Sequence, residues 1–348
     1  MAPSKSLIFA KIPDGEPVMG EHMTIETRDV DISTAPAGGL AVEVLYMSLD
    51  PYQRRRMRDP SIKSYVPAFQ VGKPVASWTV SRVLRSDLPG YAEGDLVRAM
   101  TDMAQYARIE GPMIAKTATK VDNSLGLDLG CFLGPLGIAG QTAWSGLYEI
   151  GKPKRGETIF VSSAAGAVGQ IVGQVAKREG LTVIGSVGSD DKLDFITREL
   201  GFDAGFNYKK EAPIDALRRL APNGIDIYFD NVGADHLEAA IEVMNFQGRI
   251  VACGMISEYN KPLSECKGVS NLRYIVSKSI TMRGYIYTDP DFGPAYEERL
   301  LASLPKWLSD GSVKAKLDIT NGIENAGDAF IGMLRGQNYG KAMVKVTA

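Results

Sequence analysis

Residues 158–177, TIFVSSAAGAVGQIVGQVAK, constrain more than any other stretch what this chain can fold into. The stretch opens on an apolar run at 159–161, which is typical of a buried strand, and then turns through S-x-x-G-x-x-G at 163–169. Beyond the turn, apolar side chains recur at helical i, i+3, i+4 and i+7 spacing: Val168, Ile171, Val172 and Val175. A strand, a tight glycine-bearing turn and a helix predict the first half of a βαβ unit.

The two glycines of this turn have separate predicted roles. Gly166 would let the backbone approach a diphosphate closely, and Gly169 would let the helix pack against the strand. The amides of Ala167, Val168 and Gly169 would point at the anion, and the helix dipole would add to the attraction. Turns of this kind also occur for tight packing alone, so the motif leaves that alternative open.

The end of the next predicted strand, 182–186, bears on the choice of cofactor. An NAD enzyme would place Asp or Glu there to bind the ribose hydroxyls, whereas residues 186–189 are small and uncharged. Asp190 is predicted to cap the following helix, and Lys192 lies one turn inside it. An uncharged strand end followed by Ser189 and Lys192 suits a 2′-phosphate, which predicts NADP(H). The alternative for Lys192 is an ordinary solvated lysine.

Composition narrows the class of protein. The chain of 348 residues is long enough for two domains, and its 45% hydrophobic and 23% charged residues are typical of a globular chain. A net charge of -2 gives no general attraction to nucleic acid, and the arginine run at 54–58 is flanked by acidic residues. No apolar run approaches the ~20 residues of a membrane span. Three widely spaced cysteines, Cys131, Cys253 and Cys266, predict a reducing, cytoplasmic setting.

The chain divides into two patterns. Residues 1–125 carry short β-rich runs separated by Gly and Pro turns, which predicts a small β-barrel domain. Residues 126–310 alternate strands and helices, which predicts an α/β, doubly wound parallel sheet of the Rossmann type. Residues 311–348 break the alternation and are expected to return to the first domain through a strand at 343–346. In the second domain, strands are expected at 158–162, 182–186, 204–207, 225–229, 247–252 and 280–284, and helices at 167–179, 190–200, 212–221, 234–245 and 294–309.

The sequence has too few candidate ligands for a zinc site. A catalytic zinc needs about three protein ligands and a structural zinc four. The chain offers only His22, His236 and its scattered cysteines, without a C-x-x-C pair, so a zinc-independent chemistry is expected. His236 is interpreted as an ordinary packing or surface histidine. What remains is hydride transfer assisted by hydroxyl groups, for which the candidate donors are Tyr52, Tyr65, Tyr259, Tyr285 and Tyr287.

Several ordered segments carry a family resemblance. They are the glycine turn with the preceding LGPLGIAGQTAWSGLYEIGKPKRGE, and MSLDPYQRRRM, VGSDDKLDF, FNYKK, FDNVGADHL, CGMISEYN and QNYGKAMVKV. On these segments the chain resembles the zinc-free branch of the medium-chain dehydrogenase/reductase superfamily. Within that branch it resembles the prostaglandin reductase / leukotriene hydroxydehydrogenase family of alkenal and enone double-bond reductases. The resemblance implies a GroES-like barrel domain beside the Rossmann domain, and a cytoplasmic homodimer.

The resemblance also implies residue roles. Ser189, Lys192 and Tyr208 would hold the 2′-phosphate side of NADP(H). The full set of implied cofactor-binding residues is Gly166, Ala167, Val168, Gly169, Ser189, Lys192, Tyr208, Asn231, Cys253, Gly254, Tyr259, Tyr285, Ile286, Tyr287 and Asn338. Substrate would be bound by Tyr52, Tyr65, Tyr259 and Tyr287. The alternative for Tyr52 and Tyr65 is packing in the barrel, and the alternative for Tyr259 is packing of its own loop. The chain departs from the family pattern at Gln53, where D-P-Y-M-R has Met, and over 262–271.

These observations predict an NADPH-dependent 2-alkenal/enone reductase that acts on a small conjugated carbonyl, with no nucleic acid or membrane partner. Hydride would reach the β-carbon, and a donor aimed at the carbonyl oxygen would stabilise the enolate. Tyr259, with the cofactor ribose hydroxyl, is the predicted donor, and Tyr52 is the second candidate. An NADPH quinone oxidoreductase and a non-catalytic NADPH-binding protein stay open as alternatives.

Overall fold

A computed structural model of the chain describes residues 1–346. It contains two compact units, of which unit 1 comprises Met1–Leu133 and Leu317–Ala348 and unit 2 comprises Gly134–Lys316. The predicted boundaries, after 125 and after 310, each lie a few residues earlier in the chain. Among the described residues, no helix combines the length and the apolar character that a membrane crossing requires.

Unit 2 is built on a six-stranded sheet whose strand order is β11-β10-β9-β12-β13-β14. The strands are β9 (Thr158–Val161), β10 (Thr182–Val187), β11 (Ala204–Asn207), β12 (Ile225–Asp230), β13 (Met244–Ala252) and β14 (Thr281–Gly284). All five pairings in this sheet are parallel. The order reverses at β9, as in a doubly wound dinucleotide-binding sheet, and confirms the predicted fold class.

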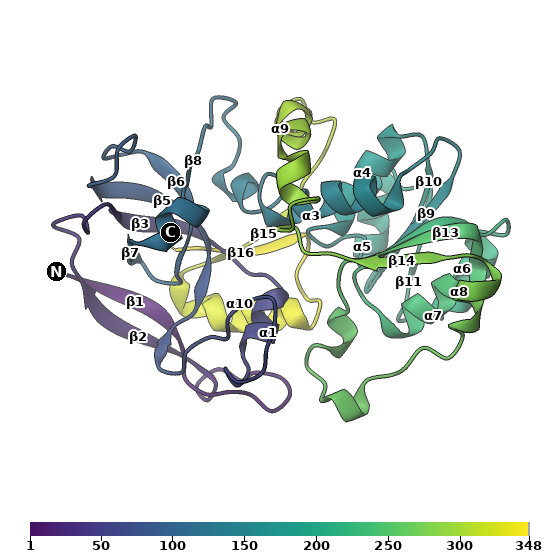
Figure 1. The fold of residues 1–348 in the computed structure, drawn as a ribbon, viewed down its shortest axis with the longest axis horizontal. Helices are drawn as coiled ribbons and strands as arrows, with labels where there is room; N and C mark the ends of the chain where they lie inside the picture. The colour runs from purple at the N-terminus through teal and green to yellow at the C-terminus, as the bar shows by residue number, and fades with distance from the viewer. Residues whose placement is uncertain (347–348) are drawn as a thin grey trace. The chain divides into compact units, whose positions relative to one another are not determined.

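Helices cover both faces of this sheet (Figure 1). In the figure α3 and α4 lie on one side, and α6 and α7 lie on the other. The helices of unit 2 are α3 (Ile138–Gly146), α4 (Gly169–Arg178), α5 (Asp190–Asp194), α6 (Pro213–Leu220), α7 (Ala234–Val243), α8 (Arg273–Ser277) and α9 (Gly293–Ser309). Shorter helical turns are η2 (Leu147–Gly151), η3 (Phe195–Glu199), η4 (Ile256–Glu258) and η5 (Leu263–Glu265).

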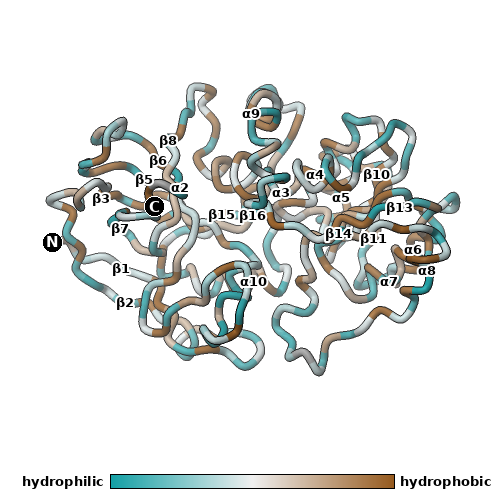
Figure 2. Tube along the Cα trace, in the orientation of Figure 1, coloured by the Kyte–Doolittle hydropathy of each residue, from teal (hydrophilic) through white to brown (hydrophobic). Residues whose placement is uncertain are grey.

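Because both faces are covered, the central strand β9 is rich in apolar residues. Ile159, Phe160 and Val161 of β9 are each 0% exposed, which explains the continuous apolar run in the sequence. The ring of Phe160 stacks on Tyr228 at 4.9 Å and on Phe206 at 5.8 Å between ring centroids. Figure 2 shows hydrophobic residues concentrated along these strands and hydrophilic ones on the outer loops.

The start of α5 corrects one expectation. Ser189, not Asp190, caps this helix, because Ser189 has extended backbone angles and its hydroxyl accepts a hydrogen bond from the Lys192 amide. Asp190 is already helical, and its carboxylate accepts from the Asn207 side chain at 2.9 Å and pairs with Lys210. Serine and aspartate are both good helix caps, so the sequence alone does not decide between Ser189 and Asp190. Tertiary contacts decide which of the two caps α5.

Unit 1 is predominantly antiparallel sheet. A larger sheet has the order β15-β16-β3-β5-β6-β8, with β7 paired to β3, and a smaller one has the order β2-β1-β4. The strands are β1 (Ala2–Phe9), β2 (Met23–Val30), β3 (Leu40–Ser48), β4 (Lys73–Pro74), β5 (Ala76–Ser86), β6 (Leu96–Asp102), β7 (Tyr106–Ile109), β8 (Thr119–Lys120), β15 (Leu317–Asn321) and β16 (Lys341–Lys345). The helical segments are α1 (Tyr52–Arg56), α2 (Pro112–Thr117), η1 (Leu129–Phe132), η6 (Ile323–Asn325) and α10 (Ala326–Leu334).

The end of the chain completes the larger sheet of unit 1. Strand β16 pairs antiparallel with β3, with Val344 opposite Met47, and parallel with β15. Met47 and Val344 are both 0% exposed and belong to one apolar cluster. The last strand therefore contributes to the core of a unit whose strand β3 lies about three hundred residues earlier in the sequence.

Candidate cofactor site and active site

The glycine turn joins β9 to α4 with little space to spare. Ser163 adopts a left-handed φ of 52°, and the Gly166 amide donates to its carbonyl oxygen at 2.9 Å. A Cβ at Gly169 would lie 2.4 Å from that carbonyl oxygen and 2.8 Å from the Cα of Ala164. Only glycine lets α4 start this close to the strand end, so the helix N-terminus, with its positive dipole, lies directly beside the carboxyl end of β9.

A buried polar network ties the ends of β9 and β12, where the strand order reverses. The Tyr228 hydroxyl donates to Asp230 Oδ1 at 2.7 Å and lies 3.1 Å from the Ser162 hydroxyl. Asn231, which follows β12, donates from its backbone amide to Ser162 Oγ at 2.9 Å and from its side chain to the Ser162 carbonyl at 2.8 Å. Burial raises the pKa of Asp230. In open α/β sheets ligands bind at this reversal, and here its geometry is fixed by hydrogen bonds.

The residues predicted to hold a 2′-phosphate follow neighbouring strand ends. Val187 of β10 pairs with Asn207 of β11, so Ser189 and Tyr208 leave the sheet side by side. The hydroxyl of Tyr208 packs over Gly188, where a Cβ would lie only 3.1 Å away, and Tyr208 remains 41% exposed. Lys192 lies in the first turn of α5, beyond the cap that Ser189 provides. The folded chain therefore groups Ser189, Lys192 and Tyr208 at one edge of the sheet.

The loop after β13 folds back on itself at Tyr259. The amides of Cys253 and Gly254 both donate to the Asp230 carbonyl at 2.9 Å, which anchors the loop to the end of β12. The Tyr259 hydroxyl accepts a hydrogen bond from the Met255 amide at 3.3 Å and lies over Gly254. A hydroxyl that accepts a hydrogen bond is polarised towards donating its own proton. The Tyr259 hydroxyl therefore lies next to Gly254, in the loop that follows the carboxyl end of β13.

Tyr285 lies against α3. Its hydroxyl donates to the Thr142 carbonyl at 2.7 Å, and its ring stacks on Phe292 with centroids 4.7 Å apart. A Cβ at Gly146 would lie 2.2 Å from this hydroxyl, so the helix needs glycine there to receive the ring. Burial raises the pKa of the neighbouring Cys253 thiol to about 12, although part of the residue is exposed. Cys253 is thus a neutral thiol rather than a nucleophile.

The two residues after Tyr285 form a turn that leads into α9. The Ile286 amide donates to the Asp289 carboxylate at 3.1 Å, and the Tyr287 carbonyl accepts from the Gly293 amide at 2.8 Å. Both side chains are half-buried. Asp289 therefore holds the backbone of Ile286, and the start of α9 holds that of Tyr287.

In unit 1, the arginine run holds the loop that carries Tyr65. Arg58 donates to the carbonyls of Ile62 at 3.0 Å and Val66 at 2.6 Å. Arg56 stacks on the Phe69 ring at 4.1 Å and donates to the Pro67 carbonyl at 3.0 Å. The guanidinium groups of Arg56 and Arg58 therefore bind backbone carbonyls of their own unit.

The predicted substrate residues of unit 1 differ in their exposure. Tyr65 is 59% exposed at the surface of the loop, whereas Tyr52 is half-buried in the first turn of α1. Burial lowers the pKa of Arg56, and an interaction with Tyr52 opposes that shift. Asn338 lies before β16, and its side chain donates to the Gly340 carbonyl at 2.7 Å.

Candidate metal ligands are scattered in the part of the chain that the structure describes. No three of its His, Cys, Asp and Glu side chains are grouped to hold a metal ion. His236 is 5% exposed and stacks near Phe160, and burial lowers its pKa to about 4. It is a packing histidine.

Comparison with known proteins identifies the family. Residues 5–117 match the family model described as N-terminal domain of oxidoreductase, and residues 167–302 match the one described as zinc-binding dehydrogenase. An NADP-dependent oxidoreductase of Cochliobolus heterostrophus is 48% identical over 347 residues, covering 99% of this chain and 98% of that protein. An NADP(+)-dependent 2-alkenal reductase of Nicotiana tabacum is 40% identical over 348 residues, with 99% and 98% covered. The chain belongs to the alkenal/enone reductase branch of the medium-chain dehydrogenases/reductases.

The medium-chain reductase also has a solved structural counterpart. CurA from Vibrio vulnificus in complex with NADPH superimposes with a TM-score of 0.89 at 32% identity, and 99% of each chain is covered. The predicted NADP(H) dependence and oxidoreductase class are therefore confirmed. The glycine turn, the α4 N-terminus and the uncharged end of β10 fit such a cofactor, because nothing acidic at the end of that strand would repel a 2′-phosphate.

Proposed function

We propose that this medium-chain reductase reduces the C=C bond of α,β-unsaturated aldehydes and ketones. The observation that carries the proposal is the Tyr259 hydroxyl, polarised by the Met255 amide at the carboxyl end of the NADP-binding sheet. NADPH supplies the hydride when bound, and a proton completes reduction of the double bond. Hydride arriving at the β-carbon leaves negative charge on the carbonyl oxygen, and a hydroxyl donor stabilises that charge.

Each unit has a part in the proposal. Unit 2 would bind NADPH, with Ser189, Lys192 and Tyr208 at the 2′-phosphate. The remaining cofactor contacts would come from the glycine turn, Gly166 to Gly169, and from Asn231, Cys253, Gly254, Tyr259, Tyr285, Ile286, Tyr287 and Asn338. Of these, Tyr285 would act through ring packing, since its hydroxyl is bound to Thr142.

Substrate would be oriented by tyrosines. We assign Tyr259 the role of donor to the carbonyl oxygen, together with a cofactor ribose hydroxyl, and Tyr52 the role of second donor. Tyr65 and Tyr287 would contact the rest of the substrate. The exposed position of Tyr65 in a loop held by backbone hydrogen bonds supports a contact role rather than a core role. The α-carbon proton would come from solvent.

A substrate panel tests the function. The purified enzyme with NADPH is given a conjugated enone, a conjugated aldehyde, their saturated analogues and a quinone, and NADPH loss and products are both followed. We expect the conjugated compounds to give saturated carbonyls and the saturated analogues to be inert. Quinone turnover without double-bond reduction would identify a quinone oxidoreductase instead, and NADPH binding without any turnover would identify a non-catalytic protein.

A homodimer is also proposed, and the open edge of the unit 2 sheet supports it. Strand β14 is the last in the strand order, and all four of its residues are exposed. Exposed hydrophobic side chains lie on and near it, with Met282 37% and Val276 83% exposed. An unpaired strand edge of this kind is a template for pairing with a second chain. Light scattering on the purified protein, with Met282→Lys as the disrupting variant, tests it.

A cytoplasmic location is proposed as well. All three cysteines are free in the structure, as expected in a reducing compartment.

A further inference from the structure

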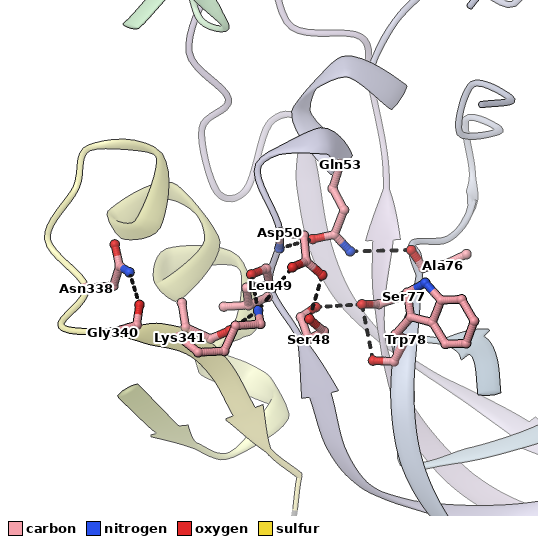
Figure 3. A network of polar contacts seen from close by, with 11 residues as sticks. Ser48, Leu49, Asp50, Gln53, Ala76, Ser77, Trp78, Asn338, Gly340 and Lys341 are labelled. Atoms are coloured by element: carbon pink, nitrogen blue, oxygen red, sulfur yellow. Dashed lines mark hydrogen bonds and ion pairs between the residues drawn. The ribbon is translucent and has the colours of Figure 1, made fainter. Parts of the chain in front are cut away.

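A buried ion pair in unit 1 joins two segments that are far apart in the sequence. Lys341 is 1% exposed, and its ammonium lies 3.2 Å from Asp50 Oδ1 (Figure 3). The same ammonium donates to the carbonyls of Leu49 at 2.6 Å and Ala342 at 2.8 Å. An ammonium has three protons, and each has an acceptor here. The charge is therefore fully satisfied and fixed in one geometry.

Asp50, the acidic partner of this pair, fixes the backbone at the start of α1. Asp50 accepts from the Ser48 hydroxyl at 2.5 Å, and its amide donates to Gln53 Oε1 at 2.9 Å. Gln53 is 1% exposed, and its side-chain amide reaches the Ala76 carbonyl of β5 at 3.5 Å. The turn that carries Tyr52 is thus held between the ion pair and β5. The glutamine that departs from the family's D-P-Y-M-R pattern is itself part of this network.

Lys341, the basic partner, lies next to the turn that precedes β16. Lys341 directly follows Gly340, whose carbonyl accepts from the Asn338 side chain at 2.7 Å. The Leu49 amide donates to the Ala342 carbonyl at 3.2 Å, which closes the connection between the two segments. Figure 3 shows Asn338 on one side of this network and Ala76, Ser77 and Trp78 on the other.

Stability alone does not account for such a pair. Replacing a buried ion pair by apolar residues of similar size is often neutral or stabilising, whereas removing one partner leaves a costly unpaired charge. A fully hydrogen-bonded pair does, however, fix the relative position of the two backbones that bear it. We propose that Asp50 and Lys341 are positioning residues that hold Tyr52 and the Asn338 turn in one register. The inference rests on the proposed function, which assigns Tyr52 and Asn338 to the active site.

Hydrogen exchange on the NADPH-loaded enzyme tests the coupling. The variants are Lys341→Met, Asp50→Asn and the double variant. The matched control is Glu324→Gln, which removes an exposed ion pair with Lys5 from the same unit. Each single variant is expected to lose at least about tenfold protection at both 48–53 and 338–342, since opening one segment releases the other. Amides of β6 should keep their protection, and the double variant should lose less than the two single losses combined.

Kinetics provide the second readout. Turnover of an enone should fall at least about tenfold in Lys341→Met, because misplacement of about 1 Å is costly to catalysis. The preference for NADPH over NADH should not change, since the proposed 2′-phosphate residues lie in unit 2.

The outcomes distinguish a failure of the positioning role from a failure of the proposed function. Loss of protection in one segment alone, or equal loss throughout unit 1, would overturn the positioning role. If Lys341→Met does not fold, Asp50→Asn and the double variant carry the same comparison. If the wild-type enzyme turns over no conjugated carbonyl, the proposed function fails while the exchange data still decide whether the two segments are coupled.

Discussion

Replacing Gly169 by alanine should loosen the turn between β9 and α4 and weaken NADPH binding. The added methyl group would lie 2.4 Å from the Ser163 carbonyl oxygen, 2.8 Å from Ala164 Cα and 3.0 Å from the Ala164 carbonyl oxygen. All three are backbone atoms, so rotating a side chain cannot relieve the overlap. Gly169 is the first residue of α4 and does not have a left-handed φ, so the effect is steric rather than conformational.

The size of the effect follows from these distances. Carbon contacts are comfortable near 3.5 Å, so the turn and α4 would have to separate by about 1 Å. Overpacking of this kind costs about 1–3 kcal/mol. If closure of the turn on the diphosphate must bear that cost, NADPH affinity falls about five- to a hundredfold, at 1.4 kcal/mol for each tenfold change.

A fluorescence titration with NADPH and a thermal unfolding curve measure the two effects. Gly268→Ala is the matched control, because nothing lies within 4 Å of its added methyl group and its backbone is not left-handed. The control should bind NADPH as the wild type does. Wild-type NADPH affinity and stability in Gly169→Ala would refute the reasoning, since the turn would then have room that the structure denies it.

Four further predictions concern the site. Lys192→Ala should raise the Michaelis constant for NADPH about ten- to a hundredfold and leave that for NADH nearly unchanged, because a charged hydrogen bond contributes roughly 1.5–3 kcal/mol. Equal losses with both cofactors would exclude a contact between Lys192 and the phosphate. Tyr259→Phe should slow single-turnover reduction of an enone by less than the ~10²–10³-fold of a sole donor, because a ribose hydroxyl shares the charge; an unchanged rate would move the donor role to Tyr52. Elemental analysis should find less than stoichiometric zinc, and chelators should leave activity intact, whereas a tightly held zinc needed for turnover would overturn the metal-free mechanism. With a thiol pKa of about 12, Cys253 should resist alkylation near pH 8 and react faster as the pH rises towards that value; rapid labelling of Cys253 at pH 8, read by peptide mass spectrometry, would contradict this.

Local sequence signals were sufficient for the parallel sheet of unit 2. Strands β9, β10 and β12 are largely buried, so each contains an apolar run, and the helices carry apolar residues at helical spacing. The order and ends of β9 to β12 were predicted closely for that reason. The sequence pattern gave no clear prediction where a strand contains many polar residues or a helix has no polar face. The β1–β2 pair and α10 were missed, and α10 is apolar almost throughout.

Several contacts at the candidate site were not readable from the sequence. The Tyr285 hydroxyl binds a carbonyl 143 residues earlier in the chain. The arginine run holds the carbonyls of its own loop, a choice that depends on where that loop folds. Ser189 and Asp190 are both good helix caps, and only the contacts of Asp190 with Asn207 and Lys210 decide between them.

The sequence by itself determined the cofactor-binding unit of this protein. The glycine spacing and the uncharged strand end are local features of neighbouring residues, and the shortage of metal ligands is a matter of composition. The tertiary structure alone decided how the segment bearing Tyr52 is held. Lys341 reaches the Leu49 carbonyl across 292 positions of sequence, and its charge is satisfied only when β16 lies beside β3. A buried charge needs partners within about 3 Å, and no sequence pattern records which distant backbone will supply them.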